Sequence, residues 1–547
     1  MSDTAIARPA ESRGPLNLAA RVLIAALLLF IEKFLLNGFV DTTAVHTATG
    51  MGEYIHEAQH WGFRFLVTFG AAMALFAFVQ GDERLKTLNT LARAHPIRWH
   101  WLAVHIALLV PLAELTFSFY GNHGLQWPIT LLAVSWLLIS VSSIAALFTA
   151  LAPGVIWRAA VGALGTLWLY AAVVGAVAAS VMQLSQSLLW APTTRITFEL
   201  VDRVLRPLIP TLHSNPATQV LDTGRFAVQI SELCSGLEGA GLLLAFCCAW
   251  LLYFRREYYF PRALILIPAG LALLFILNIV RIAVLVLIGH AGYPDIALFG
   301  FHSQAGWIAF NGTACLTAYL SRRSRWLNRT TDFATTHSSH NATVPYLLPL
   351  VTLLAAGMLS RAASGKFETL YPLRLLATAA ALWYCLPKLR DLDWRFSWRG
   401  VATGIGVFVL WLAAAQWLTR PSPMPAALAA LPPSGRAFWI AARAAAAVIT
   451  VPLAEELAYR GYLLRRLKRA DFESVRFGAV GVLALLISSF IFGLAHSGWW
   501  LPGTAAGLLY GLVLMRTGRL GEAVAAHATT NGLIAIWVLG LEQWQLW

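Results

Sequence analysis

Residues suited to nucleophilic chemistry lie at the ends of three apolar segments in the first half of the chain. Cys234 directly precedes one segment, Arg281 ends the next, and His302 opens the one after that. A thiolate is the nucleophilic form of cysteine, and nearby positive charge favours it. We therefore expect Cys234 to attack a peptide carbonyl and form a thioester, with His302 moving the protons and Arg281 holding the oxyanion.

Each of these three residues also has a purely structural explanation when it is taken alone. A cysteine can be a small packing residue, and an arginine near a membrane surface can be an anchor whose charge reaches the interface. However, the three residues come from separate segments and fall on one predicted side of the membrane. That coincidence favours a shared catalytic role. The five cysteines form no CxxC pair and indicate no disulfide scaffold.

A second group of ionisable residues lies inside apolar sequence in the second half. Glu455 and Glu456 stand next to each other towards the end of an apolar segment. On a helix, Glu456 and Arg460 are one turn apart and can pair, whereas Glu455 points about 100° away. Ionisable residues at membrane depth are costly and usually have partners or a function. Glu455 is therefore the expected general base.

Two histidines and an amide follow within the next 80 residues. Glu455 with His496 could activate a water for peptide hydrolysis, while His527 and Asn531, which share one helix face, could donate to the oxyanion. In the structural alternative, Glu456 and Arg460 form an ion pair that only stabilises the fold, and the histidines are interior polar groups whose hydrogen bonds are satisfied. The clustering of all these residues in apolar sequence favours catalysis.

A zinc site is the alternative chemistry that the sequence offers. His56, Glu57 and His60 fit the HExxH pattern, in which two histidines one helical turn apart bind Zn²⁺ and the glutamate acts as base. Candidates for a third ligand are His46, Glu53 and His123. A polar helix turn at the membrane surface explains the same residues, and we predict no metal and no other cofactor.

The composition predicts an integral membrane protein. Of 547 residues, 58% are apolar and 12% are Asp, Glu, Lys or Arg, against about 25% charged residues in soluble proteins. Apolar runs of about 20 residues recur along the chain, and each can cross a hydrocarbon core of about 30 Å. The formal charge of +14 indicates Lys and Arg in cytoplasmic loops rather than a nucleic-acid partner.

We predict an all-α, polytopic transmembrane helical bundle of about 15 spans, eight in a first unit and about seven in a second. The expected spans are 19–38, 61–80, 100–120, 127–150, 159–182, 235–254, 263–283, 304–320, 344–360, 373–387, 401–418, 438–457, 477–496, 503–515 and 522–540. Gly503, Gly507 and Gly511 recur at four-residue spacing, so their helix should pack closely against a neighbour.

The distribution of positive charge predicts the orientation. Arg8, Arg13 and Arg21 lie before or at the start of the first span, whereas residues 40–60 contain no Lys or Arg, so the N-terminus should be cytoplasmic. Counting spans from there places Cys234, Arg281 and His302 at the outer face. The same count puts Glu455 and His527 near cytoplasmic ends but His496 near an outer end. Either the helix containing His496 is kinked or re-entrant, or the boundaries there differ.

Two polar stretches divide the chain. Residues 183–232 should form an outer loop that includes a strand-like run at 226–230. Residues 322–343, rich in Ser, Thr, Asn and His, should form a cytoplasmic linker between a unit at 15–321 and a unit at 344–547.

The first unit resembles the exosortases. Cys-Ser-Gly at 234–236, Asn-x-x-Arg at 278–281 and a histidine that opens the last span carry the resemblance, which covers about residues 15–321. Exosortases are bacterial membrane enzymes that cleave C-terminal sorting signals by a sortase-like cysteine mechanism. The resemblance implies Cys234 as nucleophile, with Arg281 and His302 as its partners.

The second unit resembles the CPBP intramembrane proteases, which include the CAAX prenyl-protein endopeptidase. The motifs EExxxR, FxxxH and HxxxN are all present, and the resemblance covers about residues 345–547. It implies a site of Glu455, Glu456, Arg460, His496, His527 and Asn531. An exosortase joined to such a unit is similar to the exosortase E/protease fusions, which are associated with a VPEID-type C-terminal sorting signal.

The sequence thus predicts a protein-processing enzyme, a multi-pass protein of a bacterial inner membrane. Its expected partners are exported proteins with C-terminal sorting signals and the lipid bilayer, and the oligomeric state stays open. A polytopic transporter is one alternative, because charges such as Glu32 and His105 lie within apolar segments. A non-catalytic scaffold for envelope assembly is the other. Hydrolysis and transpeptidation are both compatible with the first site.

Overall fold

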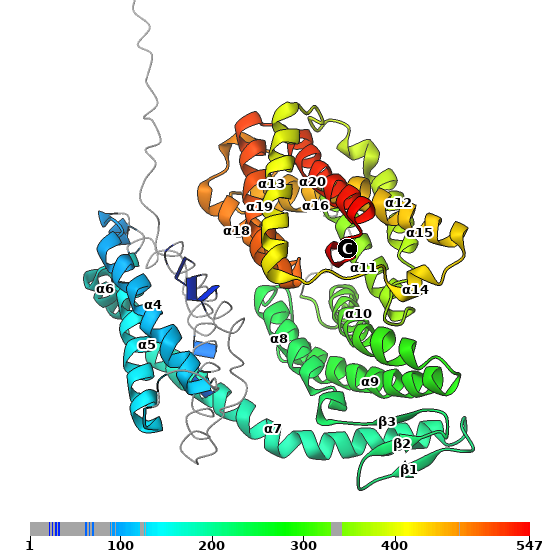
Figure 1. Ribbon diagram of the computed structural model, residues 1–547. Helices are drawn as coiled ribbons and strands as arrows, with labels where there is room; N and C mark the ends of the chain where they lie inside the picture. Colours follow the sequence, from blue (N-terminus) through cyan, green and yellow to red (C-terminus); the bar gives the residue numbers. More distant parts are fainter. Residues whose placement is uncertain are drawn as a thin grey trace, which may run out of the picture. The chain divides into compact units, whose positions relative to one another are not determined.

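The computed structural model describes residues 94–120, 125, 127–329, 342–469 and 471–547, together with scattered residues between 21 and 92 (Figure 1). The chain forms two compact units, Met1–Leu189 and Trp190–Trp547. The predicted organisation into 15–321, a linker at 322–343, and 344–547 stays a prediction.

The described part of the first unit consists of apolar helices. α4 (Trp99–Tyr120) and α5 (Ile129–Leu151) pack side by side, and α6 (Gly154–Leu164) follows. Gly165 ends α6 with a φ of 56°, a left-handed value that favours glycine, and α7 (Leu167–Leu205) begins after it. Within α4, the His105 Nε2 lies 2.7 Å from Glu32 Oε1. The buried imidazole of His105 therefore has a carboxylate partner, as polar groups at membrane depth usually do.

A small antiparallel sheet follows α7. Its strands are β1 (His213–Asn215), β2 (Val220–Asp222) and β3 (Ala227–Gln229), paired in that order. β3 confirms the strand expected at 226–230. The outer loop expected at 183–232 is wrong over its first part, because α7 continues to Leu205 and is stabilised there by two i,i+4 ion pairs.

Three long helices follow the sheet: α8 (Leu237–Tyr253), α9 (Leu266–His290) and α10 (His302–Arg323). A π-helical turn, η3 (Ile296–Phe301), leads directly into α10. The bounds of these helices agree with the segments expected at 235–254, 263–283 and 304–320, except that α9 ends at His290 rather than at residue 283. Arg281 therefore lies within α9 and not at its end, since the apolar run that forms the helix continues past the arginine. Of the three, α9 is long and apolar enough to cross a membrane, and α8 is one of the shorter apolar helices.

The chain from residue 344 onward forms a helical bundle (Figure 1). Its helices are α11 (Val344–Ala362), α12 (Pro372–Leu389), α13 (Trp398–Leu418), α14 (Ala426–Ala429), α15 (Pro433–Ala445), α16 (Val451–Glu456), α17 (Leu464–Arg466), α18 (Val482–Leu494), α19 (Trp500–Thr517) and α20 (Leu520–Leu541). Two π-helical stretches, η5 (Ala446–Thr450) and η6 (Leu457–Leu463), flank α16 within one continuous helical segment, Pro433–Arg466. π-helical turns are rare and are frequent at functional sites.

Glu455 and His496 line the same cavity, although the expected spans placed them near opposite membrane faces. The helical segment that contains Glu455 does not end at 457 but continues to Arg466. α18 begins at Val482 rather than at 477, and His496 follows its last residue, Leu494. Lys468 donates to the carbonyl of Ala479, which ties the end of the first segment to the chain just before α18. The boundaries there thus differ from the expected ones.

The predicted glycine stripe packs α19 against α18. A Cβ on Gly507 would lie 3.0 Å from Ser489 Cα, and one on Gly503 would lie 3.2 Å from Gly493 Cα. Only glycine allows backbones to approach so closely.

Replacing Gly507 with alanine should destabilise the bundle by about 1–3 kcal/mol, because the added methyl group meets backbone that must shift. Thermal unfolding of the purified protein in detergent tests this. Gly540→Ala is the matched control, since a Cβ there meets nothing within 4 Å. Equal melting temperatures for the two variants would contradict the close packing.

Eight of the described helical segments are long and apolar enough to cross a membrane, including Trp99–Ser118, Arg262–His290, Pro433–Arg466 and Leu520–Leu541. Three shorter apolar helices accompany them. The protein is therefore an all-α, polytopic helical membrane protein, as the sequence predicts. The number of 15 spans stays a prediction.

Candidate active sites

Cys234 is presented by a tight turn between the sheet and α8. The turn is a short 3₁₀ helix, η1 (Glu232–Ser235), in which Cys234 Sγ lies 3.7 Å from Ser231 Oγ. Gly236 follows with a φ of 82° and turns the chain into α8. The thiol is half-buried beside an apolar cluster formed by α7, the sheet and α9. It therefore lies at a helix entrance and not in a helix interior.

Asn278 of α9 holds this turn in place. Its Nδ2 donates to the carbonyl oxygen of Cys234 at 2.9 Å, and the residue is only 6% exposed. A Cβ on Gly236 would lie 3.0 Å from the amide of Asn278, so glycine allows the approach. The sequence assigned no role to Asn278, although the Asn-x-x-Arg spacing places it on the same helix face as Arg281.

Arg281 lies within electrostatic range of both the cysteine and the histidine. Its Nε is buried with no hydrogen-bond partner among the described residues. A Cβ on Gly306 of α10 would lie 2.8 Å from Arg281 Nη1. Gly306 is one turn after His302, so the two share the face of α10 that meets Arg281. The structure thus places Arg281 within electrostatic range of Cys234 and of His302, while no hydrogen bond or ion pair joins these three residues in the described part of the chain.

Glu456 is the centre of a buried ionic network in the C-terminal bundle. Its side chain is fully buried, and its Oε1 accepts from Arg460 Nη1 at 3.1 Å and from His527 Nδ1 at 3.0 Å. Arg460 Nη2 also donates to the carbonyl of Gly507 at 3.0 Å. The predicted ion pair between Glu456 and Arg460 is present, and it holds His527 as well.

Glu455 faces the other nitrogen of the same imidazole. Its Oε2 lies 3.9 Å from His527 Nε2 and has no hydrogen-bond partner among the described residues. The ring of Tyr510 stacks on His527, with centroids 5.1 Å apart and planes 19° apart, and its hydroxyl donates to Thr530 Oγ1. His527 is thus fixed in orientation between two carboxylates, and Glu455 is free to act on a substrate or water.

His496 lies in the short connection between α18 and α19. Its Nδ1 is 2.8 Å from the carbonyl oxygen of Phe492. A carbonyl oxygen only accepts, so Nδ1 carries the proton and Nε2 of the neutral ring is an acceptor. This nitrogen can take a hydrogen bond from a water.

Asn531 is anchored by the first π-helical stretch. Its Nδ2 donates to the carbonyl oxygen of Ala447 in η5 at 2.8 Å. A π turn displaces carbonyls from the regular helical ladder and leaves them open to side-chain donors. One amide hydrogen of Asn531 is used in this contact, and the second remains available.

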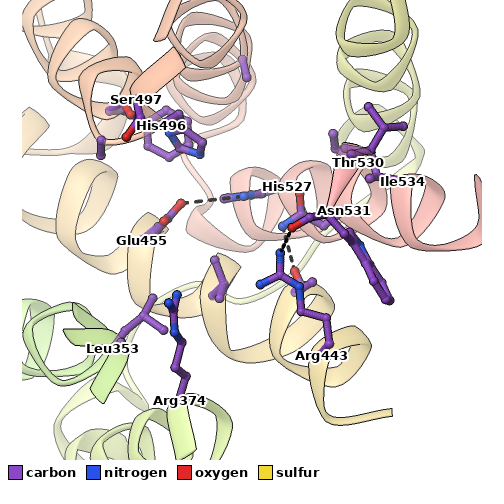
Figure 2. Close-up of a pocket in the computed structure, with 18 of the residues that line it drawn as sticks. Leu353, Arg374, Arg443, Glu455, His496, Ser497, His527, Thr530, Asn531 and Ile534 are labelled. Atoms are coloured by element: carbon purple, nitrogen blue, oxygen red, sulfur yellow. Dashed lines mark hydrogen bonds and ion pairs between the residues drawn. The ribbon is translucent and has the colours of Figure 1, made fainter. Parts of the chain in front are cut away.

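These residues surround one cavity. Glu455, His496, His527 and Asn531 all line a space of about 470 Å³ in the bundle, and Figure 2 shows the first three side chains converging on it. A volume of this size is typical of sites for small ligands or short peptide segments. The arrangement of a free carboxylate, an acceptor imidazole and polar donors can activate a water against a peptide carbonyl.

Replacing Arg460 with methionine should destabilise the protein by about 3–5 kcal/mol, because it leaves the buried Glu456 carboxylate without its cation. Thermal unfolding in detergent measures the loss. Arg516→Met, an exposed position, is the control, and the double variant Glu456→Gln/Arg460→Met should recover part of the loss. A stable single variant would show that the ion pair is dispensable.

The candidate zinc ligands His56, Glu57 and His60 lie outside the described residues. In the part of the chain that the structure describes, no group of three or more His, Cys, Asp or Glu residues is placed to hold a metal ion. The candidates for a third ligand, His46, Glu53 and His123, also lie outside the described residues, so the zinc alternative stays a prediction.

Two family models match the chain, one around each candidate site. The protein is a multi-pass membrane peptidase that processes proteins: residues 56–319 match the family model for transmembrane exosortases, and residues 437–533 match the model for type II CAAX prenyl endopeptidases, Rce1-like. No curated protein and no solved structure matches the chain. The chain thus resembles an exosortase in its first half and a CAAX-type protease towards its end.

Proposed function

We propose that the chain processes exported proteins at two separate catalytic centres in a bacterial inner membrane, with its N-terminus in the cytoplasm. The first centre cleaves C-terminal sorting signals at the outer face with Cys234 as nucleophile. The second is a Glu/His endopeptidase that needs no metal ion. The two family matches support a peptidase at each place.

At the first centre, Cys234 Sγ attacks the carbonyl carbon of the sorting signal. His302 protonates the leaving nitrogen as the C–N bond breaks, and a thioester remains. Water or an amine then attacks the thioester and gives its proton to His302, which releases the product and restores the thiolate. The guanidinium of Arg281 holds the oxyanion in both steps, with a buried Nε that has no other partner among the described residues.

At the second centre, Glu455 removes a proton from a water that also donates to His496 Nε2. The resulting hydroxide adds to the peptide carbonyl, and the oxyanion accepts from His527 and from the second amide hydrogen of Asn531. Glu455 then gives its proton to the leaving amine as the C–N bond breaks. Glu456 and Arg460 contact no substrate in this scheme and hold His527 in position.

One observation carries the proposal for the second centre. His527 lies between two glutamates, 3.0 Å from Glu456 and 3.9 Å from Glu455, inside a cavity that both His496 and Asn531 line. A purely structural ion pair would require only one of these carboxylates.

Co-expression with a reporter protein that carries a C-terminal sorting tail tests the division of labour. Wild type, Cys234→Ala and Glu455→Ala are compared by following the size of the reporter. We expect processing at the sorting tail to stop in Cys234→Ala and to continue in Glu455→Ala.

A transporter or scaffold would leave the reporter intact even with the wild-type chain. Inhibition by a chelator that zinc reverses would favour metalloprotease chemistry at His56, Glu57 and His60. If processing stops only in Glu455→Ala, the second centre carries out the sorting step, and our assignment of that step to Cys234 is wrong.

A further inference from the structure

The helical turn that precedes His302 is packed against the C-terminal bundle. η3 leads directly into α10, whose first residue is His302. α10 packs beside α11 of the bundle, and η3 contacts the C-terminal end of α11 (Figure 1). We call the segment that η3 contacts, residues 361–366, the seat. The seat lies between the two family matches, at 56–319 and 437–533, and belongs to neither of them.

Gly300 makes the closest contact between η3 and the seat. A Cβ on Gly300 would overlap the carbonyl oxygen of Ser364 and would lie 2.6 Å from the carbonyl oxygen of Arg361. Any larger residue would therefore push η3 away from the seat. Gly300 and Ser364 are both buried, and Ser364 Oγ donates to the carbonyl of Ser360 at 2.8 Å. The seat thus presents a fixed backbone surface two residues before His302.

Further contacts join the seat to the start of η3. A Cβ on Gly365 would lie 3.1 Å from the Cβ of Asp295, the residue just before η3. Lys366 Nζ lies 3.6 Å from Asp295 Oδ1 and 4.8 Å from the centroid of the Phe299 ring. The ion pair is exposed and stabilises little by itself, but it joins the same two segments. Both ends of η3 therefore touch the seat.

His302 lies between two close contacts of its own helical segment. Because η3 and α10 are continuous, a displacement of η3 is passed on to His302. One turn after His302, a Cβ on Gly306 would lie 2.8 Å from Arg281 Nη1. The segment is thus held at Gly300 by the seat and at Gly306 by Arg281, which fixes the backbone from which the imidazole extends. A displacement of about 1 Å at a catalytic group can lower the rate about 10²-fold.

We infer that the seat is a positioning element of the first centre: through its contact with Gly300 it holds His302 where the imidazole can protonate the leaving nitrogen. Gly300, Ser364 and Gly365 touch no substrate in this role. The first centre is then incomplete without α11, a helix that also lines the cavity of the second centre. This inference rests on the role proposed for His302 at the first centre.

Acylation of Cys234 by two matched substrates distinguishes a displaced His302 from a general loss of structure. One substrate is a peptide with a VPEID-type sorting signal and an intact scissile amide. The other is the N-terminal product of its cleavage, made as a p-nitrophenyl ester, whose leaving group needs no proton. Single-turnover acylation of the full chain in nanodiscs is measured with both. In Gly300→Ala we expect amide acylation to fall about tenfold or more, and ester acylation to stay within about threefold of wild type.

Gly365→Ala changes the seat itself and is milder, because the added methyl group meets the Asp295 side chain at 3.1 Å. It should show the same selective loss of amide acylation, by about threefold. Gly312→Ala is the matched control, since Gly312 lies on α10 and a Cβ there meets nothing within 4 Å. Both of its rates should equal those of wild type. His302→Ala is the reference and should lose amide acylation selectively, at least as strongly as Gly300→Ala.

A variant that only unfolds loses both rates to the same extent, so a selective loss of amide acylation in either seat variant supports the inference. Equal losses of both rates in Gly300→Ala and Gly365→Ala, or wild-type rates in both, would overturn it. In that case a selective loss in His302→Ala would leave the proposed function intact. If His302→Ala shows no selective loss, the role proposed for His302 is wrong, and the seat has no catalytic residue to position.

Discussion

Cys234→Ala should abolish cleavage of sorting-signal peptides by the purified full chain, with a fall of at least about 10³-fold in kcat/KM, because no other group in the site can form the thioester. The local geometry distinguishes the thiol of Cys234 from those of the other cysteines. It lies in a turn fixed by Asn278 and within electrostatic range of Arg281, whereas the other cysteines of the described helices lie within apolar segments. Cleavage in nanodiscs, followed by mass spectrometry, measures the loss.

Cys248→Ala is the matched control, since Cys248 is exposed on α8 and lies away from the turn. It should cleave at the wild-type rate. Mass spectrometry of wild type, quenched in acid during turnover, should also show the acyl fragment on Cys234. Full activity of Cys234→Ala would end the thiol mechanism, and an acyl group found on another residue would relocate the nucleophile.

Glu455→Gln should abolish cleavage by the second centre, with a fall of roughly 10²–10⁴-fold in kcat, because an amide cannot take the proton from water. The shape of the site should survive, since Glu455 Oε2 has no hydrogen-bond partner among the described residues and the Glu456–Arg460–His527 network does not depend on it. Single-turnover cleavage of a peptide released by wild type measures the chemical step.

Glu456→Gln should differ from Glu455→Gln in its effect on stability. That change weakens the buried network, so it should lower the melting temperature as well as the activity, whereas Glu455→Gln should lower the activity alone. Glu542→Gln, an exposed carboxylate just after α20, should change neither quantity. Activity that survives in Glu455→Gln would remove this residue from the role of general base.

The first site is predictable from sequence because a membrane restricts how a chain can run. Apolar segments of fixed length must alternate in direction, so residues at the ends of successive segments reach a common side. Cys234 and His302 lie at such ends, whereas Arg281 lies within α9, nine residues before its last residue. Asn278 was not predictable as a partner of Cys234, since its hydrogen bond joins side chain and backbone across two elements.

In the second site, regular helical spacing predicts the contact within one helix but not the contacts between helices. The pairing of Glu456 with Arg460 follows from helical spacing alone. The second contact of Glu456, with His527, depends on how α20 packs beside α16. The carbonyl that anchors Asn531 belongs to a π-helical turn, for which the sequence carries no periodic signal.

The sequence by itself determined the helical membrane architecture, the residue types of both sites and the pairing within a single helix, because hydrophobic length and one-turn spacing act locally along the chain. Only the tertiary structure decided the position of His527 between two glutamates and the meeting of Glu455, His496, His527 and Asn531 at one cavity. Those contacts join helices far apart in sequence, and close packing of side chains, not any local preference, sets which of them meet.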